Sequence, residues 1–224
     1  MRGVISLLIL FTLATFAEQK INTVKPKVYM GRKIAWTMHC TAAHWLTRTE
    51  REKEENTSEM LRELKLKQGM TIADVGCGNG YHAITLAKSV GEKGKVLCVD
   101  VQKPMLDMLQ KRAKEAGIKN CETILGEFTD PKLPKNSVDL ILLVDAYHEF
   151  TEPEAMLKKM REALKPDGTL VLVEFRKEDK SVPIKEDHKM TKKQMDKELT
   201  ANGFKEVRSY DKLPWQHMIF FGKK

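Results

Sequence analysis

Three glycines occupy alternate positions in the stretch ADVGCGNGYH, residues 73–82, where an apolar run ends and a helix-like pattern begins. Gly76, Gly78 and Gly80 keep this turn free of side chains, which lets a ligand lie against the backbone at the N-terminus of the following helix. The alternative is that they only permit positive φ angles in a tight turn. Their G-x-G-x-G spacing is one residue shorter than the dinucleotide fingerprint G-x-G-x-x-G, which argues against a nicotinamide-dependent oxidoreductase.

Two carboxylates accompany the glycine turn. Asp74 lies inside the strand that precedes the turn, and Asp100 ends the next predicted strand, KVLCVD. A carboxylate at this place, about 20 residues beyond the turn, can accept hydrogen bonds from both hydroxyls of a ribose. The alternative is that Asp100 only caps the next helix. Taken with the glycines, the two carboxylates favour a site for a ribose-containing ligand.

Polar side chains also follow the fourth and fifth predicted strands, namely Asp145, Tyr147, His148, Glu149, Glu174 and Arg176. In open α/β sheets the ligand crevice lies beyond the carboxyl ends of the strands, which is where these residues fall. His148 is the leading candidate for a general base, because an imidazole titrates near neutral pH. The alternative is that His148 and Glu149 only hydrogen-bond the start of the neighbouring helix.

The remaining members of this group have supporting roles in the prediction. Asp145 and Tyr147 are expected to line the site and to fix the substrate. Glu174 ends an apolar strand and needs a partner if it is buried, for which Arg176 is a candidate. No pair of histidines follows an H-x-x-x-H or comparable spacing, so the sequence predicts no metal site.

Strand-like and helix-like segments alternate along the chain after residue 69. The predicted strands are residues 71–75, 95–100, 121–125, 138–144 and 169–175, and the predicted helices are residues 81–90, 104–116 and 151–164. This alternation predicts a doubly wound, Rossmann-like α/β fold with a mainly parallel sheet. A C-terminal antiparallel hairpin over residues 204–211 and 217–222 brings the sheet to seven strands. Capping-box patterns at Thr151 and Thr191 predict two helix starts, and KPDG, residues 165–168, predicts a turn.

Four motifs stand in order along this alternation: IADVGCGNG, VLCVD, LGEF and LKPDGTLVLVEF. With them the chain resembles a class I S-adenosylmethionine-dependent methyltransferase over roughly residues 45–222. It is most similar to the branch that carries VDAYHEF after the fourth strand and HKM and LPWQH near the end, whose members are mostly of unassigned substrate.

The resemblance implies S-adenosylmethionine as cofactor. It implies that Asp74 helps to hold the ammonium end, Asp100 the ribose and Glu127 the adenine amino group, although the family more often has aspartate at the last position. The full set of cofactor-binding residues would be Asp74, Gly76, Cys77, Gly78, Gly80, Asp100, Val101, Glu127, Phe128 and Asp145. The catalytic candidates are Tyr147, His148, Glu149 and Glu174.

The predicted function is methyl transfer to a small or medium-sized acceptor by in-line displacement. The sequence has no N/D-P-P-Y stretch of the kind found in amino-methylating DNA and glutamine methyltransferases, and no Pro-Cys pair of the cytosine type. Little chain is left for a recognition domain, which argues against a nucleic-acid acceptor. The alternatives are a non-catalytic module that binds S-adenosylmethionine or a partner, and a methyltransferase acting on protein or nucleic acid.

The chain of 224 residues, with 42% hydrophobic residues and a net charge of +8, is predicted to divide into three parts. Residues 1–17 resemble a signal peptide or a short N-terminal anchor, residues 18–68 an entry or lid segment, and residues 69–224 the methyltransferase domain. Cleavage would make the protein secreted or periplasmic. The alternative is a membrane-anchored protein facing the cytoplasm, which contacts the membrane through this segment alone. The four cysteines are expected to be free thiols.

Overall fold

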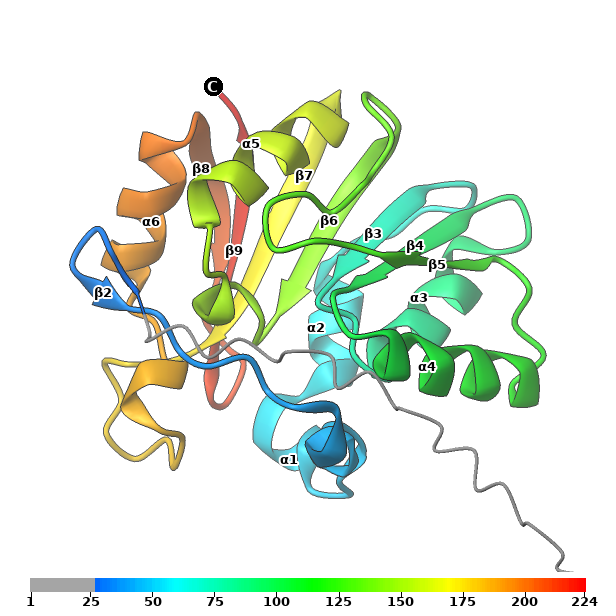
Figure 1. The fold of residues 1–224 in the computed structure, drawn as a ribbon, viewed down its shortest axis with the longest axis horizontal. Coiled ribbons are helices and arrows are strands. Elements are labelled where there is room, and N and C mark those ends of the chain that lie inside the picture. The colour runs from blue at the N-terminus through cyan, green and yellow to red at the C-terminus, as the bar shows by residue number, and fades with distance from the viewer. Residues whose placement is uncertain (1–26) are drawn as a thin grey trace, which may run out of the picture.

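The computed structural model describes residues 27–224, so the leader predicted over residues 1–17 lies outside the described residues. A seven-stranded sheet forms the centre of the described chain, in the order β5-β4-β3-β6-β7-β9-β8 (Figure 1). Its strands are β3 (Thr71–Val75), β4 (Lys95–Asp100), β5 (Cys121–Leu125), β6 (Val138–Val144), β7 (Leu164–Phe175), β8 (Phe204–Tyr210) and β9 (Gln216–Lys223).

The sheet is parallel from β5 through β7, and β9 pairs antiparallel with both β7 and β8. The predicted doubly wound sheet with a C-terminal hairpin is therefore confirmed. Helices cover both faces of β6, which leaves few positions for polar side chains. Its sequence, VDLILLV, is accordingly almost entirely apolar.

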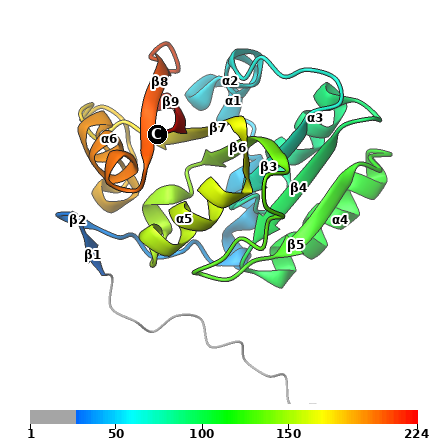
Figure 2. The ribbon, with the colours of Figure 1, turned by 90° about the horizontal axis from the view of Figure 1, so that it is seen from above.

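Helices form a layer on each face of the sheet (Figures 1 and 2). On one face, α5 (Pro153–Ala163) and α6 (Lys192–Ala201) bury Met156, Met160, Met195 and Leu199 against the strands. On the other face lie α2 (Thr57–Glu63), α3 (Tyr81–Val90) and α4 (Lys103–Glu115). The two apolar layers hold the strand ends in register, and the loops at the carboxyl edge carry the polar residues.

Two local predictions need correction. Thr151 does not cap α5, because the helix begins after Glu152, which makes no side-chain capping hydrogen bond. β7 starts at Leu164 rather than after KPDG, although residues 165–168 bulge out of its pairing with β6, since Val138 pairs with Leu164 and Leu140 with Thr169. The second cap is confirmed: the Thr191 hydroxyl accepts a hydrogen bond of 3.0 Å from the amide of Gln194.

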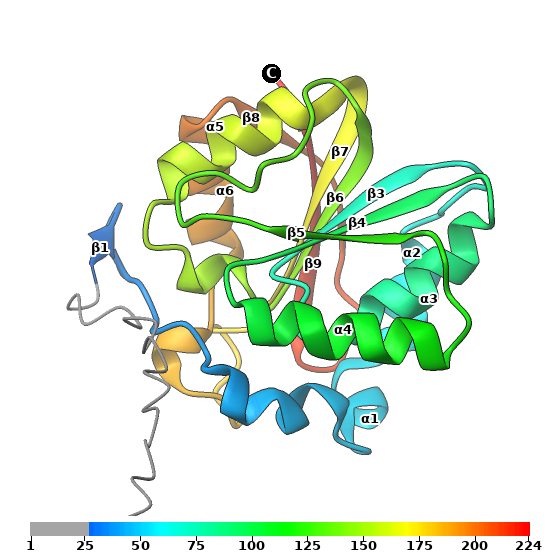
Figure 3. The same cartoon turned by 45° about the vertical axis from the view of Figure 1, so that its right-hand side comes forward.

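The described part of the entry segment runs past the carboxyl edge of the sheet (Figure 3). It consists of β1 (Val28–Tyr29), β2 (Arg32–Lys33), the 3₁₀ helix η1 (Cys40–Thr47) and α1 (Arg51–Glu55), which precede α2. Among residues 27–224, no helix has the length and apolar character needed to cross a membrane.

A buried ion pair attaches this segment to α6. Arg32 donates to both oxygens of Glu198, at 2.8 and 3.0 Å, and to the carbonyl oxygen of His148 at 2.9 Å. Glu198, which is 0% exposed, also accepts a hydrogen bond of 2.7 Å from the Tyr147 hydroxyl. Arg32 therefore connects the entry segment, α6 and the turn after β6.

Candidate active site

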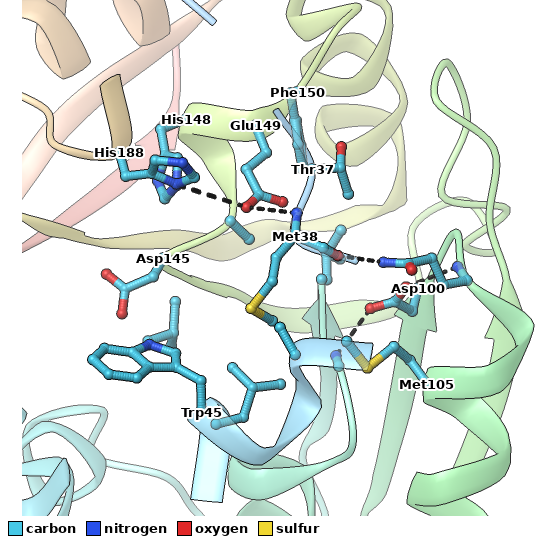
Figure 4. Close-up of a pocket in the computed structure, with 18 of the residues that line it drawn as sticks. Thr37, Met38, Trp45, Asp100, Met105, Asp145, His148, Glu149, Phe150 and His188 are labelled. Carbon is cyan, nitrogen blue, oxygen red and sulfur yellow. Dashed lines mark hydrogen bonds and ion pairs between the residues drawn. The ribbon is translucent and has the colours of Figure 1, made fainter. Parts of the chain in front are cut away.

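A cavity of about 520 Å³ opens at the carboxyl ends of β3, β4, β6 and β7 (Figure 4). This volume falls in the range of small-molecule sites, about 300–1,000 Å³. Nine predicted site residues line it: Gly76, Gly78, Asp100, Val101, Glu127, Phe128, Asp145, His148 and Glu149. The other five lie outside its lining: Asp74, Cys77, Gly80, Tyr147 and Glu174.

The glycine turn forms the floor of the cavity. Gly76 and Gly78 have positive φ angles of 78° and 51°, which glycine adopts without strain. A Cβ atom on Gly76 would lie 2.6 Å from the Cβ of Ala146, and one on Gly78 would lie 2.6 Å from a methyl group of Leu46. The missing side chains therefore bring the turn close to two other wall segments as well as leaving its backbone open to a ligand.

Two further residues of the turn serve the packing between helices. Gly80 precedes α3 with a φ of 79°, and a Cβ there would lie 2.5 Å from the Cγ of Leu109 on α4. Cys77 is buried in the apolar layer beneath α3. Burial raises the pKa of its thiol well above the usual value, so Cys77 stays protonated. All four cysteines of the chain are free.

Asp100 holds the far side of the turn. Its carboxylate accepts hydrogen bonds from the amide of Gly78 at 3.0 Å and from the amide of Gln102 at 2.8 Å. The residue is 8% exposed, and desolvation raises the pKa of its carboxyl group. Asp100 therefore presents a fixed carboxylate to the cavity, as recognition of a ribose diol requires.

Buried polar and charged side chains form the wall of the cavity opposite Asp100. Asp145, with a φ of 49°, accepts a hydrogen bond of 2.7 Å from Gln216 through one oxygen, while its other oxygen has no partner among the described residues. Arg51 lines the same wall, held by Glu55 at 2.7 Å and by the carbonyl oxygen of Leu46 at 2.8 Å. An acceptor without a partner beside a guanidinium fits the ammonium and carboxylate of an amino acid.

Asp74 lies behind this wall, 2% exposed, with one oxygen lacking a partner in the described chain. Burial raises the pKa of its carboxyl group to about 7, although the charge of Arg51 opposes the shift. The folded protein therefore holds a proton that the unfolded chain releases at lower pH.

We expect Asp74→Asn to stabilise the cofactor-free protein at alkaline pH and to change little near pH 4. Wild-type stability falls as pH rises through the folded-state pKa, and the neutral amide removes this loss. A pKa of about 7 in place of 3.8 corresponds to at most about 4 kcal/mol above pH 8. Urea unfolding at pH 5 and pH 8 measures the difference, with exposed Asp167→Asn as control. An equal effect at both pH values contradicts the prediction.

His148 is the centre of a buried polar group after β6. Its Nδ1 lies 2.6 Å from Glu174, and its Nε2 lies 3.1 Å from Nδ1 of His188. Burial disfavours the imidazolium, but the adjacent Glu174 carboxylate outweighs it and raises the pKa of His148 to about 9. Burial and the charge of His148 lower the pKa of His188.

Glu174 acts from behind the cavity wall. Besides His148, it accepts a hydrogen bond of 2.9 Å from the amide of Tyr147. Arg176, the partner expected from the sequence, instead donates to the carbonyl oxygens of Asp211 and Leu213 at 2.7 and 2.9 Å, which corrects that prediction. Tyr147 is fully buried, and its hydroxyl contacts Glu198 rather than the cavity. Glu174 is thus placed to position His148, and Tyr147 to support the turn.

A segment that we call the strap, residues 34–40, crosses the cavity mouth. The amide of Met38 donates to Glu149 at 3.1 Å, and its carbonyl oxygen accepts from Gln102 at 2.8 Å. Gln102 also accepts a hydrogen bond of 2.9 Å from the amide of Cys40. Figure 4 shows Met38 between Asp100 on one side and the His148, Glu149 and His188 group on the other.

The sequence did not identify several residues of this site. Gln102, Arg51 and Glu55 belong to no motif, and only the i,i+4 spacing of the Arg51–Glu55 pair gave a local signal. Gln216 lies in the LPWQH motif, but the motif assigned it no role. Four further residues, from the entry segment and the loop after β7, also line the cavity: His44, Trp45, Arg48 and His188. His39, Trp215 and His217 lie outside its lining.

The sequence profile of a family described as "Methyltransferase domain" matches residues 66–218 of the chain. The chain belongs to this family. A solved S-adenosylmethionine-dependent methyltransferase from Aquifex aeolicus is similar to it, with a TM-score of 0.78 and 28% identity over 83% of this chain and 98% of the other. A putative type 11 methyltransferase from Sulfolobus solfataricus shares the fold, with a TM-score of 0.61 at 21% identity, over 76% of this chain and 94% of the other.

Among curated proteins, the methyltransferase domain is similar to enzymes of quinone biosynthesis. It is 32% identical over 113 residues to the ubiquinone/menaquinone biosynthesis C-methyltransferase UbiE of Escherichia fergusonii, covering 50% of this chain and 45% of that protein. It is 26% identical to the demethylmenaquinone methyltransferase of Bacillus velezensis over 70% of this chain and 64% of that protein. The chain thus spans less than two thirds of the length of these relatives.

These findings confirm the predicted family and fold and imply S-adenosylmethionine as the cofactor. The residues of the cavity fit that group. Asp100 offers a fixed carboxylate for the ribose, and the partnerless oxygen of Asp145 beside Arg51 fits the amino-acid end. Glu127 and Phe128 line the cavity and remain the predicted contacts of the adenine.

Proposed function

We propose that the protein transfers the methyl group of S-adenosylmethionine to a small, largely apolar acceptor that binds in the same cavity. One observation carries the proposal: the glycine turn and Asp100 share a single cavity with His148 and Glu149. The cofactor supplies an electrophilic methyl group. The chain has to align a nucleophile with it, exclude water and hold the reacting atoms.

The cavity walls favour an aromatic acceptor. Apolar and aromatic side chains line much of it: Met38, Trp45, Leu46, Met105, Phe128, Phe150, Met156, Phe175 and Ile184. His148 and Glu149 are polar groups at the far end from Asp100, where they can hydrogen-bond a hydroxyl group of the acceptor. The similarity to methyltransferases of ubiquinone and menaquinone biosynthesis supports a small acceptor with a quinone-type ring.

The strap supports a small acceptor over a macromolecular one. It is anchored to Gln102 and Glu149 and reduces access to the cavity from the side where Met38 lies. Desolvation by such a cover strengthens the electrostatic contacts within the site. A protein or nucleic-acid acceptor would have to displace these anchors before its target atom entered.

Incubation of the full-length chain with methyl-labelled S-adenosylmethionine and a panel of hydroquinones and phenols tests the proposal. We expect label in a small, solvent-extractable product, and heat-unfolded chain serves as the control. Label found only on protein or nucleic acid contradicts the small acceptor. Calorimetric binding of the cofactor without label in any product, with metabolite extracts included, favours the alternative of a non-catalytic binding module.

A further inference from the structure

Two motifs that the cofactor does not account for meet at one point of the cavity. His148 and Glu149 belong to VDAYHEF after β6, and His188 belongs to HKM in the loop after β7, within η3 (Glu186–His188). Nε2 of His148 lies 3.1 Å from Nδ1 of His188 although the residues are 40 positions apart. One Glu149 oxygen lies 3.9 Å from the first nitrogen and 4.0 Å from the second.

A fourth residue fixes the orientation of the first imidazole. Glu174 lies 2.6 Å from Nδ1 of His148, the geometry of a ring nitrogen that donates to a carboxylate oxygen. Nε2 of His148 is thereby turned toward His188 and the cavity. Histidines that bind metal ions usually donate their other ring nitrogen to a carboxylate in this way, which sets the tautomer and makes the ligand more basic.

We propose that His148, Glu149 and His188 bind a divalent first-row transition metal ion on the cavity wall, with Glu174 orienting His148. Ligand-capable atoms of the three residues all lie within 4.8 Å of one another. Two imidazole nitrogens each about 2.05 Å from one ion are ~3.1 Å apart when they subtend roughly 100° at it. The observed separation of the two nitrogens, 3.1 Å, matches this distance.

Glu149 completes the site after a small adjustment. A carboxylate oxygen bound at about 2.1 Å would lie closer to both nitrogens than it does, by less than about 1 Å. The Glu149 side chain is 17% exposed, and rotation of its carboxylate supplies this shift. Its present partner is the amide of Met38, so the ion and the strap share this residue.

The donor set selects the class of ion. Imidazole nitrogens favour zinc, iron, cobalt or nickel, whereas Mg²⁺ requires oxygen ligands. Three protein ligands leave coordination positions open toward the cavity, as in catalytic rather than structural sites. An oxygen of the acceptor can occupy one of them. This last role rests on the proposed function, whereas binding of the ion itself does not.

Metal content of the tag-free, full-length chain tests the inference. After treatment with a chelator, the chain is dialysed against Zn²⁺ and, separately, Mg²⁺, and bound metal is measured by mass spectrometry. We expect one zinc per chain and no magnesium. Co²⁺ in place of zinc gives visible absorption bands that report nitrogen and oxygen ligands.

Three variants locate the ion. His188→Ala changes a half-exposed loop residue and should weaken zinc binding at least ~100-fold, and Glu149→Gln should weaken it about 10-fold or more. His44→Ala, which alters another cavity histidine outside the group, should retain the ion. Zinc below one tenth of an equivalent in the wild type overturns the inference. Equal retention in His188→Ala and Glu149→Gln, or loss in His44→Ala, overturns it as well.

Cofactor binding measured in the same samples separates this inference from the proposed function. If the wild type binds S-adenosylmethionine and methylates an acceptor but takes up no zinc, the metal site is wrong and the function stands. If the chain binds one zinc through these residues but methylates nothing, the metal site stands and the function is wrong.

Discussion

Asp100→Asn is expected to weaken binding of S-adenosylmethionine about 10- to 100-fold. A hydrogen bond to a charged group contributes about 1.5–3 kcal/mol, and the neutral amide can accept through only one oxygen. The substitution also disturbs the turn itself, because the Asp100 carboxylate holds the amides of Gly78 and Gln102. Isothermal titration calorimetry with the cofactor and with its demethylated product measures the loss.

Asp107→Asn is the matched control for this experiment. Asp107 lies on the neighbouring helix α4, its side chain is 53% exposed, and it pairs with Lys103 away from the cavity lining. It should bind the cofactor like the wild type. Unchanged affinity in Asp100→Asn, with the fold intact by circular dichroism, would show that the ribose is held elsewhere and would remove the main support for the proposed orientation.

Arg32→Met is expected to lower the free energy of unfolding by about 3–5 kcal/mol. The substitution leaves the carboxyl group of Glu198, which is 0% exposed, without its guanidinium partner at a place where water cannot replace it. Each kcal/mol corresponds to roughly 2–4 °C in Tm for a chain of this size, so Tm should fall by about 10 °C. Urea unfolding and thermal unfolding both measure the effect.

Lys33→Met and a double variant complete the test. Lys33 is the next residue of β2, with a side chain 59% exposed at 3.8 Å from Asp187, and its loss should change stability by less than about 1 kcal/mol. Arg32→Met combined with Glu198→Met should recover part of the stability, since no buried charge then lacks a partner. A single variant as stable as wild type would show that the ion pair contributes nothing net.

The fold could be predicted because local sequence patterns mark its strands and the ends of its helices. β6 is a continuous apolar run, and Gly91 and Gly117 end helices with φ angles of 67° each. The KPDG stretch does leave the pairing with β6, as its proline and glycine predict, but β7 already begins at Leu164. The sequence could not show this start, because it rests on one pair, Val138 with Leu164, that forms only in the folded sheet.

The residues of the site also divide into those with a local sequence signal and those that only the folded chain brings together. The glycine turn and Asp100 lie within one strand–helix–strand unit, so their spacing revealed them. The partner of Glu174 was misassigned because Arg176, the nearest cation in sequence, donates to the loop between β8 and β9. His148 reaches Glu174 from the end of the neighbouring strand β6. Sequence spacing gave no reason to join His148 and His188, because only the folded sheet edge brings them together.

The strap determines which part of the chain must be kept for the cavity to exist. The family profile begins at residue 66, yet Thr37, Met38, Trp45 and Arg51 belong to the enclosing wall. A truncated protein that starts at residue 66 would lose this wall and would present Asp100 and Gly78 to bulk water. Recombinant versions intended for ligand screening should therefore keep the strap, residues 34–40, and the rest of the entry segment that follows it.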